Sequence, residues 1–109
     1  MSEPQGTQPV VSLLKMPINP ERLGEFEQDL QEMLALARQQ PGFRGVETYR
    51  MRDNPGTQLI LNEWESEEAL RAFLLLPRHV EIIRNYRQRY DGQTMTHRRY
   101  VQIHPRRAD

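Results

Sequence analysis

The segment Leu59–Leu70, with the sequence LILNEWESEEAL, constrains the fold most, because it reads as a strand that runs directly into a helix. Side chains alternate across an extended backbone. Leu59, Leu61 and Glu63 therefore share one side, and Ile60, Asn62 and Trp64 share the other. Both sides are largely apolar. The helices of one small domain cover only one face of a sheet, so an apolar second face requires another layer. We expect that layer to be a second copy of the chain.

Composition excludes several classes of protein. The chain has 109 residues, enough for one domain with a modest core. Fifteen basic and fifteen acidic residues cancel, which gives no reason to expect nucleic acid or an anionic membrane as a partner. The absence of cysteine excludes disulfides, thiolate metal sites and a cysteine nucleophile. No apolar run approaches the roughly 20 residues of a membrane span, and the polar start is unlike an export signal. We expect a cytoplasmic protein.

Hydrophobic spacing and turn residues predict six elements. Asn19 and Ser66 are the expected caps of two helices, and Pro77 is expected to interrupt the second helix. Beyond that break, Val80, Ile83, Tyr86 and Tyr90 are spaced for one buried face. The predicted elements are a strand at 9–16, a helix at 20–40, a hairpin of strands at 43–52 and 57–64, a broken helix at 67–90 and a strand at 95–104.

This order of elements predicts an α+β fold of the ferredoxin-like βαββαβ type. Two right-handed crossovers give a four-stranded antiparallel sheet with the helices on one face. The domain is expected to span residues 9–104, between a flexible tail at 1–8 and a tail at 105–109. We assign Ile60, Asn62 and Trp64 to the face that the helices leave bare. A homodimer through that open face would hide its apolar patch, and a pocket would remain between sheet and helices in each subunit.

Three short pieces of sequence resemble the antibiotic biosynthesis monooxygenase family, whose members form dimeric α+β barrels. They are PGF at 41–43, NEWESEEAL at 62–70 and LPRH at 76–79. Together with the element order, the resemblance covers residues 9 to 104. The family includes enzymes that oxidise phenols or quinols with dioxygen and no cofactor, haem-degrading enzymes, isomerases and proteins of unknown role. The resemblance therefore implies the fold and the dimer more firmly than the chemistry.

The resemblance also implies site residues. Trp64 matches a tryptophan that lines the pocket of the phenol-oxidising members, Asn62 matches a polar pocket residue, and His79 lies close to a histidine that follows the proline in several members. These three are the candidate catalytic residues: an aromatic wall, an amide donor and a base. The candidate substrate-binding residues are Tyr49, Phe73, Tyr86 and Tyr100. Arg50 or Arg98 could hold an anionic group on the substrate.

Two departures from the family pattern bear on the chemistry. Phe73 stands where many members have a histidine and where the haem-degrading members have a tryptophan. The first strand also lacks the asparagine that haem degradation requires, and Ile83 falls at the position of its helix histidine. The resemblance therefore does not extend to the haem-degrading members of the family. Three scattered histidines show no metal-ligand spacing, so neither a metal nor another cofactor is expected.

Each candidate residue also has a structural interpretation. Trp64 could be a core residue, Asn62 could satisfy the barrel interior or the dimer seam, and His79 could be a surface residue beside a helix break. His97 and His104 lie seven residues apart in one strand and face opposite sides, which indicates structural or surface roles. Two functions stay open: a cofactor-independent monooxygenase acting on a small aromatic molecule, and a non-catalytic dimer that binds a small molecule or serves stress physiology.

Overall fold

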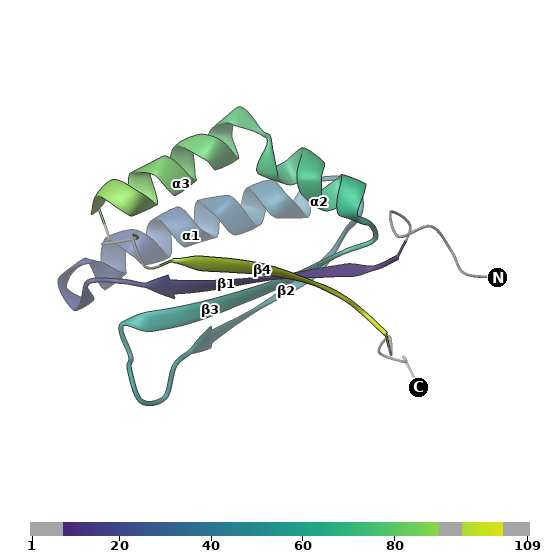
Figure 1. Ribbon diagram of the computed structural model, residues 1–109. Helices are drawn as coiled ribbons and strands as arrows, with labels where there is room; N and C mark the ends of the chain where they lie inside the picture. The colour runs from purple at the N-terminus through teal and green to yellow at the C-terminus, as the bar shows by residue number, and fades with distance from the viewer. Residues whose placement is uncertain (1–7, 90–94, 104–109) are drawn as a thin grey trace.

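The computed structural model describes residues 8–89 and 95–103, which form a sheet covered on one face by helices (Figure 1). The sheet is antiparallel in the order β2-β3-β1-β4. This arrangement confirms the predicted ferredoxin-like fold. Apart from Gln8, the predicted tails lie outside the described residues, as do Tyr90 and His104. The elements are β1 (Val10–Pro17), the short 3-10 turn η2 (Pro20–Arg22), α1 (Leu23–Arg38), β2 (Phe43–Arg50), β3 (Thr57–Trp64), α2 (Glu67–Leu74), α3 (Pro77–Arg89) and β4 (Thr96–Val101).

Both predicted helix caps are present. The Asn19 side chain accepts a hydrogen bond from the backbone N–H of Glu21 at the start of η2. The Ser66 hydroxyl accepts one from the backbone N–H of Ala69 at the start of α2. Both bonds satisfy donors that a helix start leaves without partners.

Gly42 forms the turn between α1 and β2 with a φ of +85°, in the region that favours glycine. A Cβ at this position would lie 2.6 Å from the Cβ of Ala69 in α2. The Gly42 carbonyl also accepts a hydrogen bond from the backbone N–H of Glu65, 2.8 Å away. The glycine thus lets the turn that follows α1 lie close against the start of α2.

The core lies between the sheet and the helices, and this corrects one expectation. Ile60 packs against Phe26 and Leu30 of α1, and Trp64 packs against Met33 and other residues of the second core cluster. Ile60, Asn62 and Trp64 therefore face the helices, and the assignment of these residues to the bare face was wrong. Alternation within β3 leaves Leu59, Leu61 and Glu63 on the open face instead.

The break at Pro77 changes which residues the following helix buries. His79, Ile82 and Tyr86 are the buried residues of α3, whereas Val80 is 42% exposed. Over the described part of the helix, the predicted stripe was therefore displaced by one position at its start, and only Tyr86 belongs to both the predicted and the observed set. A helix that restarts after a break sets its own rotation, so the spacing of α2 cannot be continued into α3.

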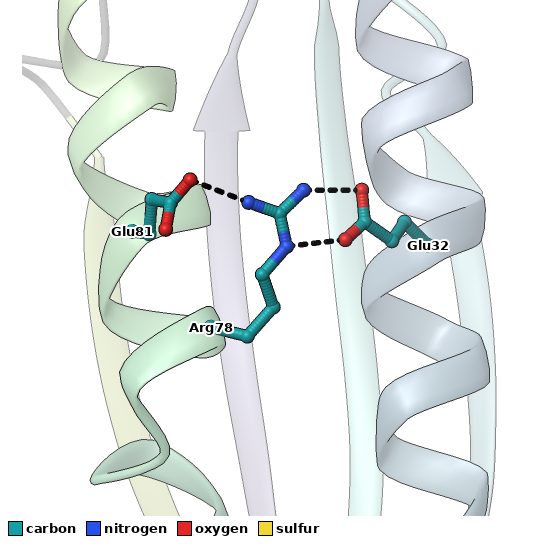
Figure 2. Close-up of polar contacts among 3 residues, drawn as sticks. All are labelled: Glu32, Arg78 and Glu81. Atoms are coloured by element: carbon teal, nitrogen blue, oxygen red, sulfur yellow. Dashed lines mark hydrogen bonds and ion pairs between the residues drawn. The ribbon is translucent and has the colours of Figure 1, made fainter.

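An exposed ion-pair network fixes the start of α3 beside α1 (Figure 2). The Arg78 guanidinium donates through Nε and Nη2 to the two carboxylate oxygens of Glu32 in α1, and through Nη1 to Glu81 in its own helix. The hydrogen bond from Arg78 lowers the pKa of the Glu32 carboxyl, desolvation opposes this shift, and the charge of Arg78 adds a smaller lowering. The network holds the first turn of α3, which carries His79.

Among the described residues, no helix is both long and apolar enough to cross a membrane.

Candidate functional site

A small cavity lies between the sheet and the helices, with about 20 Å³ of free space, room for one water molecule. Of the residues that the structure describes, three with polar side chains border it: Ser12 from β1, Asn62 from β3 and His79 from α3. The rest of the lining is apolar and consists of Leu14, Met33, Leu34, Ala37, Phe43, Val46, Ile60, Phe73 and Leu74. An apolar cavity with a few converging polar groups is the usual form of a small-molecule site.

Trp64 lies behind this cavity and orients Asn62. The two residues are two positions apart on β3 and face the helices together. Trp64 is fully buried, and its indole N–H donates to Asn62 Oδ1 at 2.6 Å. Its ring stacks on Phe73 with centroids 5.1 Å apart and meets Phe43 edge-on at 5.4 Å. The tryptophan is thus a core residue that also holds the amide in one orientation.

The bond to Trp64 determines which end of Asn62 is available to a ligand. With Oδ1 accepting the indole N–H, the amide nitrogen has no hydrogen-bond partner among the described residues. No fully buried side-chain nitrogen or oxygen of these residues lacks a partner, so this amide nitrogen is accessible from the cavity that Asn62 borders. An amide N–H₂ has two donors. Asn62 can therefore donate to an oxygen placed in the cavity.

His79 is buried, with 7% of its surface exposed, so its interpretation as a surface residue was wrong. Its ring meets that of Phe73 edge-on, with centroids 4.6 Å apart. Burial lowers the pKa of His79 below the ordinary value of 6.5, a hydrogen bond with the Leu74 backbone opposes this shift, and the neighbouring His97 adds to it. The imidazole is therefore mostly neutral at pH 7 and can accept a proton or a hydrogen bond.

An open groove of about 420 Å³ runs along α3 on the other side of His79. Leu74 and His79 border both the groove and the inner cavity. Among the described residues, the groove is further lined by Val80, Ile83, Arg84, Arg87 and Gln88. A molecule bound in the groove would be separated from Asn62 by the side chains of Leu74 and His79.

The remaining candidate residues are dispersed. Phe73 borders the cavity beside His79. Tyr86 is a core residue whose hydroxyl donates to the Pro17 carbonyl at 2.7 Å. Tyr49 and Tyr100 are about half exposed and lie on the open face of the sheet, because their strand partners Leu59 and Val11 face that side. The arrangement therefore brings together Asn62, Trp64, Phe73 and His79, but not the three tyrosines.

Sequence reasoning missed Ser12 and gave His97 only a structural or surface role. The Ser12 hydroxyl lies 2.6 Å from Nε2 of His97 across the β1–β4 pairing. A signal for Ser12 did exist, because it is the one hydroxyl in an otherwise apolar strand face. His97 alternates with exposed residues and carries no such signal. Within residues 8–89 and 95–103, no group of three or more potential ligands could hold a metal ion.

Comparisons with solved structures agree with this architecture. SnoaB of Streptomyces nogalater, described as a cofactor-independent oxygenase, is 20% identical and has a TM-score of 0.77, with 90% of this chain and 96% of that chain covered. A conserved protein of Methanosarcina mazei Go1 is 20% identical with a TM-score of 0.78, covering 88% and 94%. Rv0793 of Mycobacterium tuberculosis is 15% identical with a TM-score of 0.79, covering 89% and 97%. At these identities the likeness shows the fold alone.

Comparison of the sequence itself gives the family. No curated protein matches the chain. The sequence model named "Antibiotic biosynthesis monooxygenase" matches residues 9–85, well over half of the chain. The match includes β1, β2, β3, α1, α2 and α3 as far as Asn85. This protein therefore belongs to the antibiotic biosynthesis monooxygenase family.

Proposed function

We propose that this protein is a cofactor-independent monooxygenase that binds a small phenolic or quinol-like molecule and oxidises it with dioxygen. Family membership supports the class of reaction. The observation that carries the proposal is the pairing of a free amide donor on Asn62 with a neutral, buried imidazole on His79, at one apolar cavity. Trp64 and Phe73 supply the aromatic backing of that cavity.

The chemistry needs little from the protein beyond these groups. Dioxygen is a triplet and reacts slowly with closed-shell molecules, but a phenolate can give it one electron. Recombination of the resulting radical pair forms a carbon-bound hydroperoxide. For an anthrone, loss of water then converts the CH₂ group to C=O, so one oxygen atom enters the product and the other leaves as water. The protein must favour deprotonation and hold the oxyanion in a dry site.

Two residues take these roles. His79 accepts the hydrogen bond of the substrate hydroxyl and favours its deprotonation, and Asn62 donates to the oxyanion. The free space of about 20 Å³ is too small for an aromatic ring. Substrate therefore enters from the groove along α3 by displacing Leu74 and His79, which border both spaces.

The homodimer belongs to this proposal. The open face carries Leu13 and Leu61, which are direct partners in the centre of the sheet, with Leu59 and Val11 beside them. Packing two such faces together would remove this apolar patch from water. Sedimentation equilibrium at micromolar concentration should give twice the chain mass of 13.0 kDa, and Leu61→Glu should shift the protein to monomer. A monomeric mass for the unaltered protein would contradict the dimer.

A second candidate is a non-catalytic protein that binds a small molecule. The observation in its favour is the nearly filled interior, which leaves space for only one water. This candidate predicts quenching of the single tryptophan by aromatic ligands without any consumption of oxygen.

An oxygen electrode separates the two candidates. Metal-stripped protein is mixed with hydroquinones and with anthrone, and uptake is compared with the uncatalysed rate. We expect catalysed uptake that falls at least about 100-fold in Asn62→Ala and His79→Gln. Tyr49→Phe is the matched control, because this ring lies on the open face, and its rate should equal that of the unaltered protein. Uptake that neither cavity variant changes would exclude this site, and no uptake with any compound would favour the binding protein.

A further inference from the structure

Ser12 and His97 form a polar pair that reaches from the cavity toward the edge of the sheet. Ser12 is 1% exposed and borders the cavity. His97, on the edge strand β4, is half-buried. The Ser12 hydroxyl lies 2.6 Å from His97 Nε2. Ser12 is also the direct strand partner of Asn62, so its hydroxyl lies beside the amide assigned to the oxyanion. The pair thus connects the proposed reaction site with a ring that reaches the surface.

The hydrogen bond can carry a proton outward. A serine hydroxyl donates one hydrogen bond and accepts others at the same time. When His97 carries its proton on Nδ1, Nε2 accepts the Ser12 hydrogen, and the Ser12 oxygen remains free to accept one from a ligand. Burial lowers the pKa of His97 below 6.5, and the charges of Arg99 and Arg98 lower it further. The ring is therefore mostly neutral at pH 7 and available as an acceptor.

The surroundings of His97 favour release of a proton that it receives. On β4, Arg98 donates to the His97 carbonyl, and Arg99 is paired at 3.0 Å with Glu67 of α2. His79 of α3 faces the same region, and its charged form would repel an imidazolium at His97. Among the described residues, no carboxylate lies within ion-pair distance of the His97 ring. A protonated His97 thus has no counterion among the described residues and is a transient state.

We infer that Ser12 and His97 form a proton relay that carries the hydroxyl proton of the substrate from the cavity to solvent. The inference rests on the proposed function. The substrate O–H bond, which in anthrone is that of the enol tautomer, breaks as its proton passes to Ser12 Oγ, and the proton of Ser12 passes to His97 Nε2. The products are a phenolate, held by the Asn62 amide, and an imidazolium, which then loses one proton to water. In this scheme the substrate hydroxyl first donates to His79 on binding, and its proton is then transferred to Ser12.

The relay is tested without oxygen chemistry, so that its failure can be told from failure of the proposed function. Anthrone is mixed with the protein under nitrogen, and the rate at which its anion forms is measured by stopped-flow absorbance. Ser12→Ala and His97→Gln should each lower this rate at least about tenfold. Ser12→Thr keeps a hydroxyl and should retain the original rate. Thr96→Ala, an exposed position on β4, is the control for changes in the strand. Circular dichroism verifies that each variant is folded.

Kinetics in air give the second readout. Ser12→Ala should lower kcat for anthrone at least about tenfold, while anthrone affinity, from tryptophan quenching, changes less than about twofold. Added imidazole should restore part of the rate of His97→Gln. A rate of anion formation that is unchanged in Ser12→Ala and His97→Gln would overturn the relay even if oxygen uptake is normal. Slower anion formation in both variants, with no oxygen uptake by the unaltered protein, would support the relay and refute the monooxygenase. Failure of anthrone to bind would overturn both.

Discussion

The hydrogen bond between Trp64 and Asn62 is the part of the site whose energetic role is most directly measurable. Trp64→Phe removes the indole donor, 2.6 Å from Asn62 Oδ1, in a side chain with no exposed surface. Replacing the indole with the smaller phenyl ring should cost about 1–2 kcal/mol in burial and packing. The Asn62 oxygen is left without a donor, which should cost about 1–3 kcal/mol more. The free energy of unfolding should therefore fall by about 2–5 kcal/mol.

A double-mutant cycle separates the two contributions. Asn62→Leu alone leaves the buried indole N–H without an acceptor, whereas the double variant removes both polar groups. The double variant should thus be more stable than the sum of the single effects predicts, by about 1–3 kcal/mol. Urea unfolding, followed by circular dichroism because Trp64 itself is replaced, gives all four free energies. Additivity within about 0.5 kcal/mol would refute the claim that the tryptophan holds the amide.

The other predictions concern a turn, an ion pair and a buried imidazole. Gly42→Ala should destabilise the fold by more than about 1 kcal/mol, because residue 42 has a φ of +85° and a new Cβ would lie 2.6 Å from the Cβ of Ala69. Gly24→Ala is the control and should not destabilise the fold, because the space around its new Cβ is open. A larger loss of unfolding free energy in Gly24→Ala than in Gly42→Ala, measured by urea unfolding, would contradict this prediction. Glu32→Gln should lower Tm, and this difference in Tm should become smaller in about 1 M salt, because the ion pair with Arg78 is exposed to solvent. A difference in Tm that salt does not change would contradict a role for this ion pair. Burial lowers the pKa of His79 below 6.5, so the unfolded chain takes up a proton at this residue more readily than the folded protein. The contribution of His79 to the free energy of unfolding should therefore be complete above pH 6.5 and should be lost as pH falls through the lowered pKa. His79→Gln should reduce this decline in urea titrations at several pH values, and an equal decline would oppose the assignment.

Local chemistry was sufficient to predict the element order and the helix caps. Asn19 and Ser66 accept backbone N–H groups as their positions indicated. The choice of the buried face was not predictable from β3, because Leu59 and Leu61 are as apolar as Ile60 and Trp64. Only packing against α1 and α2 distinguishes the two sides.

The candidate site was predictable where it depends on one strand and not where it joins distant elements. Asn62 and Trp64 share a face because they are two residues apart, and alternation alone predicts that. The contact between Ser12 and His97 joins residues 85 positions apart and depends on the β1–β4 register. The burial of His79 depends on the rotation of α3 after the break at Pro77, which hydrophobic spacing misplaced.

The central claim is that this chain inserts an oxygen atom from dioxygen without a cofactor. Metal-stripped protein should be incubated with anthrone under ¹⁸O₂, and the product analysed by mass spectrometry. The account predicts one ¹⁸O atom in each product molecule, at a rate that Asn62→Ala greatly reduces. Product that carries oxygen from water, or ¹⁸O incorporation no faster than in the absence of protein, would contradict it.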